Sequence, residues 1–228
     1  MSLLLVLPVF AQESEGALEE VVVMATKREQ TLEEVPIAVS VVSMETIEQA
    51  AINDILDLQT AVPSLRVTQL QTSGNTNFII RGFGNGANNP GIEPSVGVFI
   101  DGVYRSRSAS ALADLPNLER IEVLRGPQST LFGKNASAGV INVITAAPNL
   151  EAYEGGASFT YGNYNQVIVK GDISGPITEN FGWSLAANAN QRDGYFTNLE
   201  TGNELNERDR WGVRGQLFWE PSETIRLR

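Results

Sequence analysis

The first 150 residues mix helical and strand periodicity, with glycine- and asparagine-rich loops between the apolar runs. An apolar run at 37–42 predicts a strand, and Ser43 is a good N-cap for a helix to about residue 51. Asn53 predicts the cap of a second short helix to about residue 60, which Pro63 ends. Further strands are expected at 65–69, 77–81, 95–100, 120–125 and 138–145. Together these elements predict a compact α+β domain over residues 36–148.

The pattern changes at about residue 155, where helix signals nearly vanish and four segments alternate with a period of two: 155–161, 166–174, 181–192 and 210–219. In the last segment one face is apolar: Trp211, Val213, Leu217 and Trp219. The other face is polar: Arg210, Arg214 and Gln216. Such segments suit an antiparallel sheet with two unlike faces. A soluble sandwich produces the same alternation, so the alternation leaves both architectures open.

Two features favour a membrane barrel over a sandwich. Aromatic side chains cluster at the segment ends, as they do in the interfacial girdles of outer-membrane barrels. The connections alternate between short ones and a long one at 193–207, as barrel turns and extracellular loops do. Five strands cannot close a barrel, so we expect residues 149–228 to be the first four to five transmembrane strands of an incomplete barrel.

The N-terminal residues divide into two stretches. Residues 1–11 end in an apolar run with small residues before a plausible cleavage point, which indicates the remnant of a secretory signal peptide. A buried strand is the alternative for this run. Residues 12–35 predict a polar periplasmic arm that carries one β-prone island, "EEVVVMA", at residues 19–25. No later segment approaches the roughly 18 apolar residues of a membrane helix.

Composition excludes several classes of function. The net charge of −11, from 16 basic and 27 acidic side chains, argues against nucleic acid as a partner. The sequence has neither cysteine nor histidine. This absence argues against zinc, iron–sulfur and haem sites and against a Ser-His-Asp or Cys-His catalytic pair. We therefore expect no enzyme activity, no catalytic residue, no metal site and no cofactor of the protein's own.

Two glycine motifs resemble nucleotide sites and fail their context tests. In "LRGPQSTLFGKNASAGVINVIT" (124–145), six residues separate Gly126 from Gly133, and Asn135 stands where a phosphate loop needs a hydroxyl. "RGFGNGA" (81–87) fits a dinucleotide fingerprint, with Asp101 in place of its acidic residue, but prolines and glycine follow where a helix is required. We interpret both as structural turns, and Lys134 as a solvated or wall-facing charge.

The order of an exported arm, a small α+β domain and amphipathic strands resembles the TonB-dependent outer-membrane receptors. The resemblance is carried by "FIIRGFG", "VGVFIDGVY" and above all "LERIEVLRGPQSTLFGKNASAGVINVIT". It implies a plug domain inside a barrel of about 22 strands in the outer membrane of a Gram-negative bacterium. Two departures are small: Ala138 stands where a glycine pair is usual, and Met24 replaces a common hydroxyl residue.

The resemblance also implies roles for particular residues. The energy-coupling segment, or TonB box, would consist of Glu20, Val21, Val22, Val23, Met24 and Ala25. It would add a strand to the periplasmic partner TonB. An edge strand of the plug is the alternative for Val21–Val23. Arg81 and Arg125 would lock the plug to barrel carboxylates, with ordinary surface arginines as the alternative. Ligand-facing loop residues are expected at Asn85, Asn88, Asn89, Tyr104, Arg105 and Arg107.

The function implied by the resemblance is energy-coupled uptake of a scarce ligand, first of all a ferric siderophore that carries its own iron. A non-iron ligand such as an oligosaccharide or cobalamin is the alternative within the family. Two alternatives come from other classes. A nucleotide-using enzyme depends on the two motifs that fail above, and a soluble β-rich binding module predicts that the apolar strand faces are buried.

Overall fold

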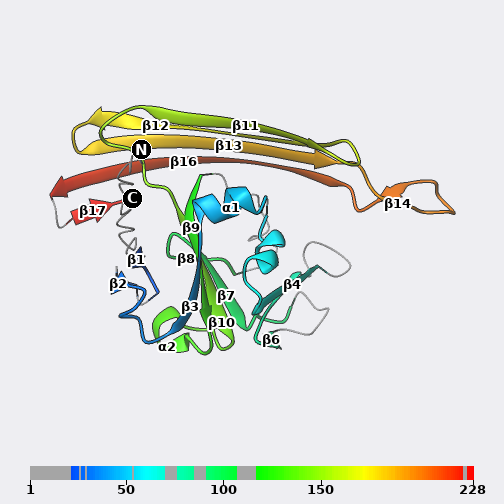
Figure 1. Cartoon of the computed structure of the whole chain (residues 1–228), viewed down its shortest axis with the longest axis horizontal. Coiled ribbons are helices and arrows are strands. Elements are labelled where there is room, and N and C mark those ends of the chain that lie inside the picture. The colour runs from blue at the N-terminus through cyan, green and yellow to red at the C-terminus, as the bar shows by residue number, and fades with distance from the viewer. Residues whose placement is uncertain are drawn as a thin grey trace, which may run out of the picture.

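The structure is a computed structural model of the chain. It describes residues 22–25, 27–28, 30–52, 54–69, 76–84, 91–106, 117–222 and 225–228. They form two bodies: the plug body, residues 22–148, and a long curved sheet above it, which we call the wall sheet (Figure 1). Among the described residues, no helix has both the length and the apolar character needed to cross a membrane.

A five-stranded sheet lies at the centre of the plug body. Its order is β3 (Ala38–Ser43), β9 (Leu118–Arg125), β10 (Gly139–Thr145), β7 (Val96–Ile100) and β8 (Val103–Tyr104). Neighbouring strands are antiparallel except β10 and β7, which are parallel. Every residue of β7 is buried, because other elements cover both faces of the sheet.

The first face of this sheet packs against α1 (Met44–Gln49), the 3-10 helix η1 (Asp57–Thr60) and a small sheet. That small sheet has the order β4 (Leu65–Gln69), β5 (Thr76–Ile80) and β6 (Phe83–Gly84). Ser43 caps α1 as the sequence predicts, since its hydroxyl accepts a hydrogen bond from the Thr46 N–H. The odd-numbered residues of β9, Ile121 and Val123, point into this apolar cluster.

The second face is covered by the N-terminal segment and by the loop between β9 and β10. The segment forms a two-stranded ribbon of β1 (Val22–Val23) and β2 (Gln30–Thr31). The loop carries the short helix α2 (Ser129–Phe132). The apolar side chains that meet here are Val23, Ala25, Val35, Phe99, Leu124, Ala136 and Val140, with Tyr104 and Phe132 packed against them.

The wall sheet is antiparallel, with strands in chain order. They are β11 (Glu154–Gly162), β12 (Gln166–Thr178), β13 (Phe181–Arg192), β16 (Arg208–Ser222) and β17 (Ile225–Leu227). A small hairpin of β14 (Phe196–Thr197) and β15 (Glu204–Leu205) extends from the long connection between β13 and β16. β13 and β16 pair without a register shift from Phe181↔Trp219 to Arg192↔Arg208.

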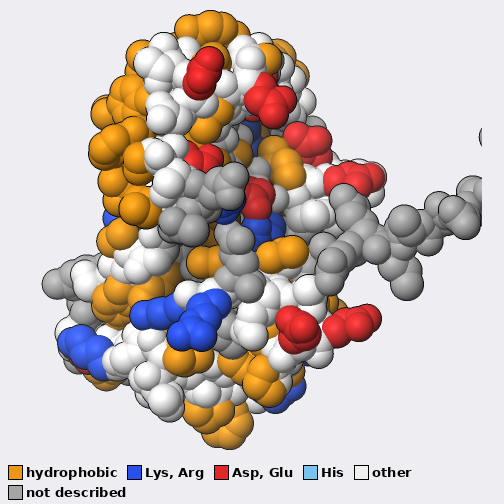
Figure 2. All heavy atoms as spheres, turned by 90° about the vertical axis from the view of Figure 1, so that its left-hand side faces the viewer, with side chains coloured by type: hydrophobic (Ala, Val, Ile, Leu, Met, Phe, Trp, Pro, Cys, Tyr) orange, Lys and Arg blue, Asp and Glu red, His pale blue; other side chains and the backbone are white. Residues whose placement is uncertain are grey.

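The predicted alternation of the wall strands is confirmed. Trp211, Val213, Leu217 and Trp219 point away from the plug body, whereas Arg210, Arg214 and Gln216 point toward it. Figure 2 shows hydrophobic side chains gathered on the outer side of the wall sheet. The inward side instead buries four polar residues beside Ile168 and Ala186: Ser174, Ser184, Asn188 and Asn190.

The plug body differs from the sequence prediction in its second helix and in several short elements. The second helix is only the 3-10 turn η1, and the Asp54 carboxylate accepts the N–H groups of Leu56 and Asp57 at its beginning. Asn53, its expected cap, lies outside the described residues. The short α2, β6 and β8 were not predicted, since two to four residues carry no periodicity of their own.

Candidate functional site

The described part of the expected TonB box, residues 22–25, lies against the second face of the plug sheet. Val22 pairs with Thr31 and Val23 with Gln30. Val23 and Ala25 are fully buried, whereas Val22 is 42% exposed. Glu20 and Val21 lie outside the described residues. The described segment thus belongs to a separate two-stranded ribbon rather than to the five-stranded sheet, and its role as the TonB box stays a prediction.

The buried carboxylate of Glu122 contacts this segment from the plug sheet. Glu122 is on β9, on the same side of the sheet as Leu124, and its side chain is fully buried. Its Oε1 accepts the Met24 N–H at 2.8 Å and the Arg120 Nε at 2.9 Å. Its Oε2 accepts the Asn142 Nδ2 at 3.2 Å, from the neighbouring strand β10. Nothing in the strand periodicity marks Glu122, because a polar residue between Ile121 and Val123 looks like ordinary alternation.

Arg81 and Arg125 come together at one surface hollow of about 490 Å³. Arg125 donates to the carbonyl oxygens of Ala38 and Val39, both at 3.4 Å. Arg81 has a left-handed backbone, with φ 52°, and its N–H donates to the Ser64 carbonyl at 2.9 Å. Among the described residues that line this hollow, none is acidic. Their pairing with carboxylates of the barrel stays a prediction.

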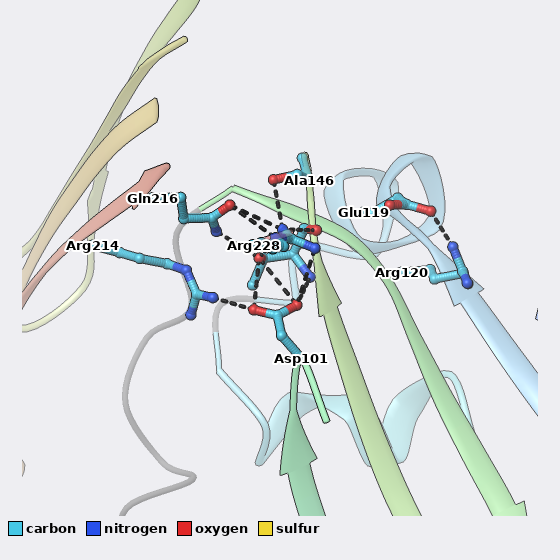
Figure 3. A network of polar contacts seen from close by, with 8 residues as sticks. Asp101, Glu119, Arg120, Ala146, Arg214, Gln216 and Arg228 are labelled. Carbon is cyan, nitrogen blue, oxygen red and sulfur yellow. Dashed lines mark hydrogen bonds and ion pairs between the residues drawn. The ribbon is translucent and has the colours of Figure 1, made fainter. Parts of the chain in front are cut away.

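The predicted lock pairs plug arginines with barrel carboxylates. In the described contacts between plug body and wall sheet, the carboxylates are instead on the plug and the arginines on the wall. Asp101, in the turn between β7 and β8, pairs with Arg214 and lies 3.5 Å from Arg228 (Figure 3). The Asp101 carboxylate also accepts the Thr145 N–H at 2.9 Å and its hydroxyl at 3.0 Å. Thr145 in turn receives hydrogen bonds from Gln216 at 2.8 Å and from Arg228 at 2.6 Å.

A second cluster joins the bodies at Asp54. Its carboxylate lies 3.2 Å from the Arg208 guanidinium and 3.4 Å from that of Arg210. Burial raises the pKa of Asp54 above its usual range, and neighbouring Asp57 raises it further. Arg208, the Leu56 N–H and Arg210 act in the opposite direction. The sequence prediction missed both clusters, although two arginines on one inward strand face signal that acidic partners lie opposite.

The expected ligand-facing residues are only partly described. Asn85, Asn88, Asn89 and Arg107 lie outside the described residues. The Tyr104 ring packs against Phe99, with centroids 5.4 Å apart, and its hydroxyl contacts the Asn135 Nδ2 at 2.7 Å. The Arg105 Nε is buried and makes no hydrogen bond within the described structure. Tyr104 thus lies in the cluster of the second face, and its contact with a ligand stays a prediction.

The described residues of the two glycine motifs form turns, strands and the short helix α2. Lys134 pairs with Glu93 at 2.5 Å on the surface, where both side chains are exposed. This pair raises the pKa of Lys134 and lowers that of Glu93. Gly84 lies in strand β6, at a point where a dinucleotide fingerprint needs the beginning of a helix. Gly126 and Gly133 have φ of 100° and 79°, which an L side chain rarely adopts.

Comparison with known proteins agrees with this architecture. A family model described as "TonB-dependent Receptor Plug Domain" matches residues 31–140. The "Iron-regulated outer membrane virulence protein" of Vibrio cholerae is 34% identical over 148 residues, 60% of this chain and 21% of that protein. The "Vitamin B12 transporter BtuB" of Vibrio vulnificus is 34% identical over 134 residues, 57% of this chain and 21% of that protein.

Among solved structures, the ferric yersiniabactin uptake receptor FyuA from Yersinia pestis matches with a TM-score of 0.76 and 25% identity. The match covers 82% of this chain and 29% of that receptor. The chain therefore spans between a fifth and a third of the length of these proteins. The plug sheet, the wall strands facing it and these matches show that the chain belongs to the TonB-dependent receptors of the Gram-negative outer membrane.

Proposed function

We propose that this protein is a receptor for energy-coupled uptake of an iron-bearing ligand, with a ferric siderophore as the ligand class. The observation that carries the proposal is the attachment of the plug to the wall through polar contacts, at Asp101 and Asp54. Polar contacts exchange readily with water, so water can replace the partners that force pulls apart. The iron-regulated Vibrio relative and the ferric yersiniabactin receptor support iron as the cargo.

The energy arrives mechanically in this proposal, because the outer membrane holds no nucleotide supply. TonB binds the segment from Glu20 to Ala25 by strand addition, which uses backbone hydrogen bonds and alternate side-chain pockets. Pulling on this segment acts on the plug sheet, with which Val23 and Ala25 are in contact. Arg81 and Arg125 hold the plug by pairing with barrel carboxylates, and the loops that carry Asn85, Asn88, Asn89, Arg105 and Arg107 face the ligand.

A non-iron ligand is the second candidate, and the vitamin B12 transporter among the relatives favours cobalamin as that ligand.

The soluble binding module has less support. Its apolar strand faces should be buried against a second sheet, yet Trp211 is 78% and Phe159 is 69% exposed. Lipid contact accounts for that exposure directly.

A pair of substitutions at Val22 tests the coupling step in the full-length receptor. Val22→Pro removes one backbone donor and fixes φ, so uptake should be lost. Val22→Thr keeps the β-branching and the N–H, so uptake should remain. Binding of the ligand at the cell surface should survive both changes. Labelled ferric siderophores and labelled cobalamin, each followed for binding and uptake, distinguish the two ligand classes. Normal uptake by the proline variant would contradict coupling through this segment.

A further inference from the structure

The N-terminal segment is more firmly engaged with the plug than a free coupling strand can be. Both backbone groups of Met24 are used: its N–H donates to Glu122, and its carbonyl accepts the Lys27 N–H at 2.9 Å. Val22 and Val23 are already paired with β2. A partner strand needs free backbone groups, so it cannot use those of residues 23–24 while the segment stays in this position.

The side chains hold the segment in the same place. Val23 and Ala25 are fully buried in the cluster of the second face, where Leu124 of β9 and Val140 of β10 lie. Only Val22 offers an exposed side chain at 42%. Release of residues 22–25 therefore empties two side-chain positions of this cluster and breaks the hydrogen bond to Glu122.

The carboxylate of Glu122 lowers the stability of the folded plug, because burying a charge costs free energy. Glu122 stands on a central strand between Val41 of β3 and Asn142 of β10, with its side chain fully buried. An apolar side chain of similar volume is commonly as stable or more stable at such a site, because burying a carboxylate costs free energy. Arg120 and Asn142 satisfy part of its hydrogen-bonding capacity, and the Met24 N–H adds a charge-assisted bond from outside the sheet.

We propose that Glu122 is a positioning residue that latches residues 22–25 to the second face of the plug sheet. The latch sets how often the segment is free to receive a partner strand. This role in coupling rests on the proposed function, whereas the latch itself is a property of the plug. Weakening the latch should expose Val23 without disturbing the first face, whose apolar cluster lies on the opposite side of the sheet.

The test measures how fast a thiol at position 23 reacts with a maleimide in the full-length receptor in outer-membrane vesicles. The 228 residues contain no cysteine, so Val23→Cys introduces a single reporter among them. Glu122→Gln keeps the side-chain volume and removes the charge, and Arg120 keeps its second partner Glu119. Labelling should accelerate about tenfold or more, since hydrogen bonds to charged groups are the strong ones.

A second pair of variants leaves the buried carboxylate in place. Met24→Pro removes the donated N–H and should accelerate labelling of residue 23 in the same way. Met24→Ala keeps the N–H and should label as slowly as the unaltered receptor. Leu58→Cys, in the apolar cluster of the first face, reports whether the plug as a whole has loosened and should stay slow in all backgrounds.

Unchanged labelling of residue 23 in both Glu122→Gln and Met24→Pro would overturn the latch. Parallel acceleration at residues 23 and 58 would also overturn it, because Glu122 would then support the plug in general. A failure of the proposed function has a different signature. In that case Val22→Pro imports normally, while labelling of residue 23 still responds to Glu122→Gln.

Discussion

The plug body and the wall sheet use the same alternation of side chains in opposite ways. On β9 of the plug, Ile121 and Val123 enter the cluster of the first face and Leu124 that of the second, and both clusters are buried. On β16 of the wall, the apolar residues are outside and the charged residues face the plug. Trp211 is 78% exposed, whereas Asn190 of the neighbouring strand is fully buried.

The physical difference lies in what surrounds each sheet. Water and other parts of the plug surround the plug sheet, so its apolar side chains meet each other. The wall sheet has lipid on one side and the plug on the other, so its apolar side needs no protein cover. A wall residue is therefore buried when it faces the plug, whether or not its side chain is apolar. The charged contacts between the two bodies, at Asp101 and Asp54, lie outside the apolar clusters of the plug.

The largest expected effect comes from placing a charge on the outer side of the wall. Leu217→Arg should impair membrane assembly, because an arginine near the bilayer midplane costs about 2–4 kcal/mol in barrels. Gln216→Arg, one residue away on the inner side, should assemble normally and lose the contacts with Thr145 and Arg228. A membrane-insertion assay on both variants measures the difference. Equal defects would remove the contrast between the two faces of the wall.

The next effect tests the polar interface between the two bodies. Asp101→Asn removes the charge that pairs with Arg214 and Arg228, and asparagine tolerates the left-handed backbone at φ 46°. We expect the free energy of interaction between plug and wall to weaken by about 2 kcal/mol, because the pair is only partly buried. Leakage of large antibiotics through the full-length receptor measures this change. Asp209→Asn, on the exposed side of β16, is the matched control and should leave leakage unchanged.

A smaller effect concerns the pH dependence of the second cluster. Because burial raises the pKa of Asp54, the folded state holds this proton more tightly than the unfolded chain does. The stabilisation from this group is therefore greatest at acid pH and is lost as pH rises through the raised pKa. Asp54→Asn cannot titrate, so its unfolding free energy should overtake that of the wild type as pH rises. Denaturant unfolding across a pH series checks this, and parallel curves for the two proteins would contradict it.

The smallest effect is expected at the exposed pair of Glu93 and Lys134. Both side chains are largely in solvent, where ion pairs contribute little. Glu93→Gln should leave stability, leakage and uptake unchanged. A loss of uptake in this variant would show that the loop after β9 contacts the ligand or the wall. That result would reverse our interpretation of Lys134 as a solvated charge.

The local structure and the two unlike faces of the wall strands could be predicted from the residues alone. The β4 strand lies at residues 65–69 as predicted, and Ser43 caps α1. The alternation along 210–219 is confirmed. It could be predicted because both the period of two and the polarity of each face depend only on neighbouring residues. The two glycine motifs could be rejected as nucleotide sites for the same reason, since their flanking residues define the elements that such sites require.

Which charged groups meet could not be predicted, because it depends on long-range packing. Asp54 and Arg210 are 156 residues apart in the sequence, and Met24 and Glu122 are 98 residues apart. No periodicity links such positions, because their contact depends on how the plug sheet folds and how the wall strands pack over it. The sequence therefore predicted a β-prone segment at 20–25 and arginines on the inner face of the wall. Their partners, Glu122 on the second face of the plug sheet and the carboxylates of Asp54 and Asp101, follow from long-range packing alone.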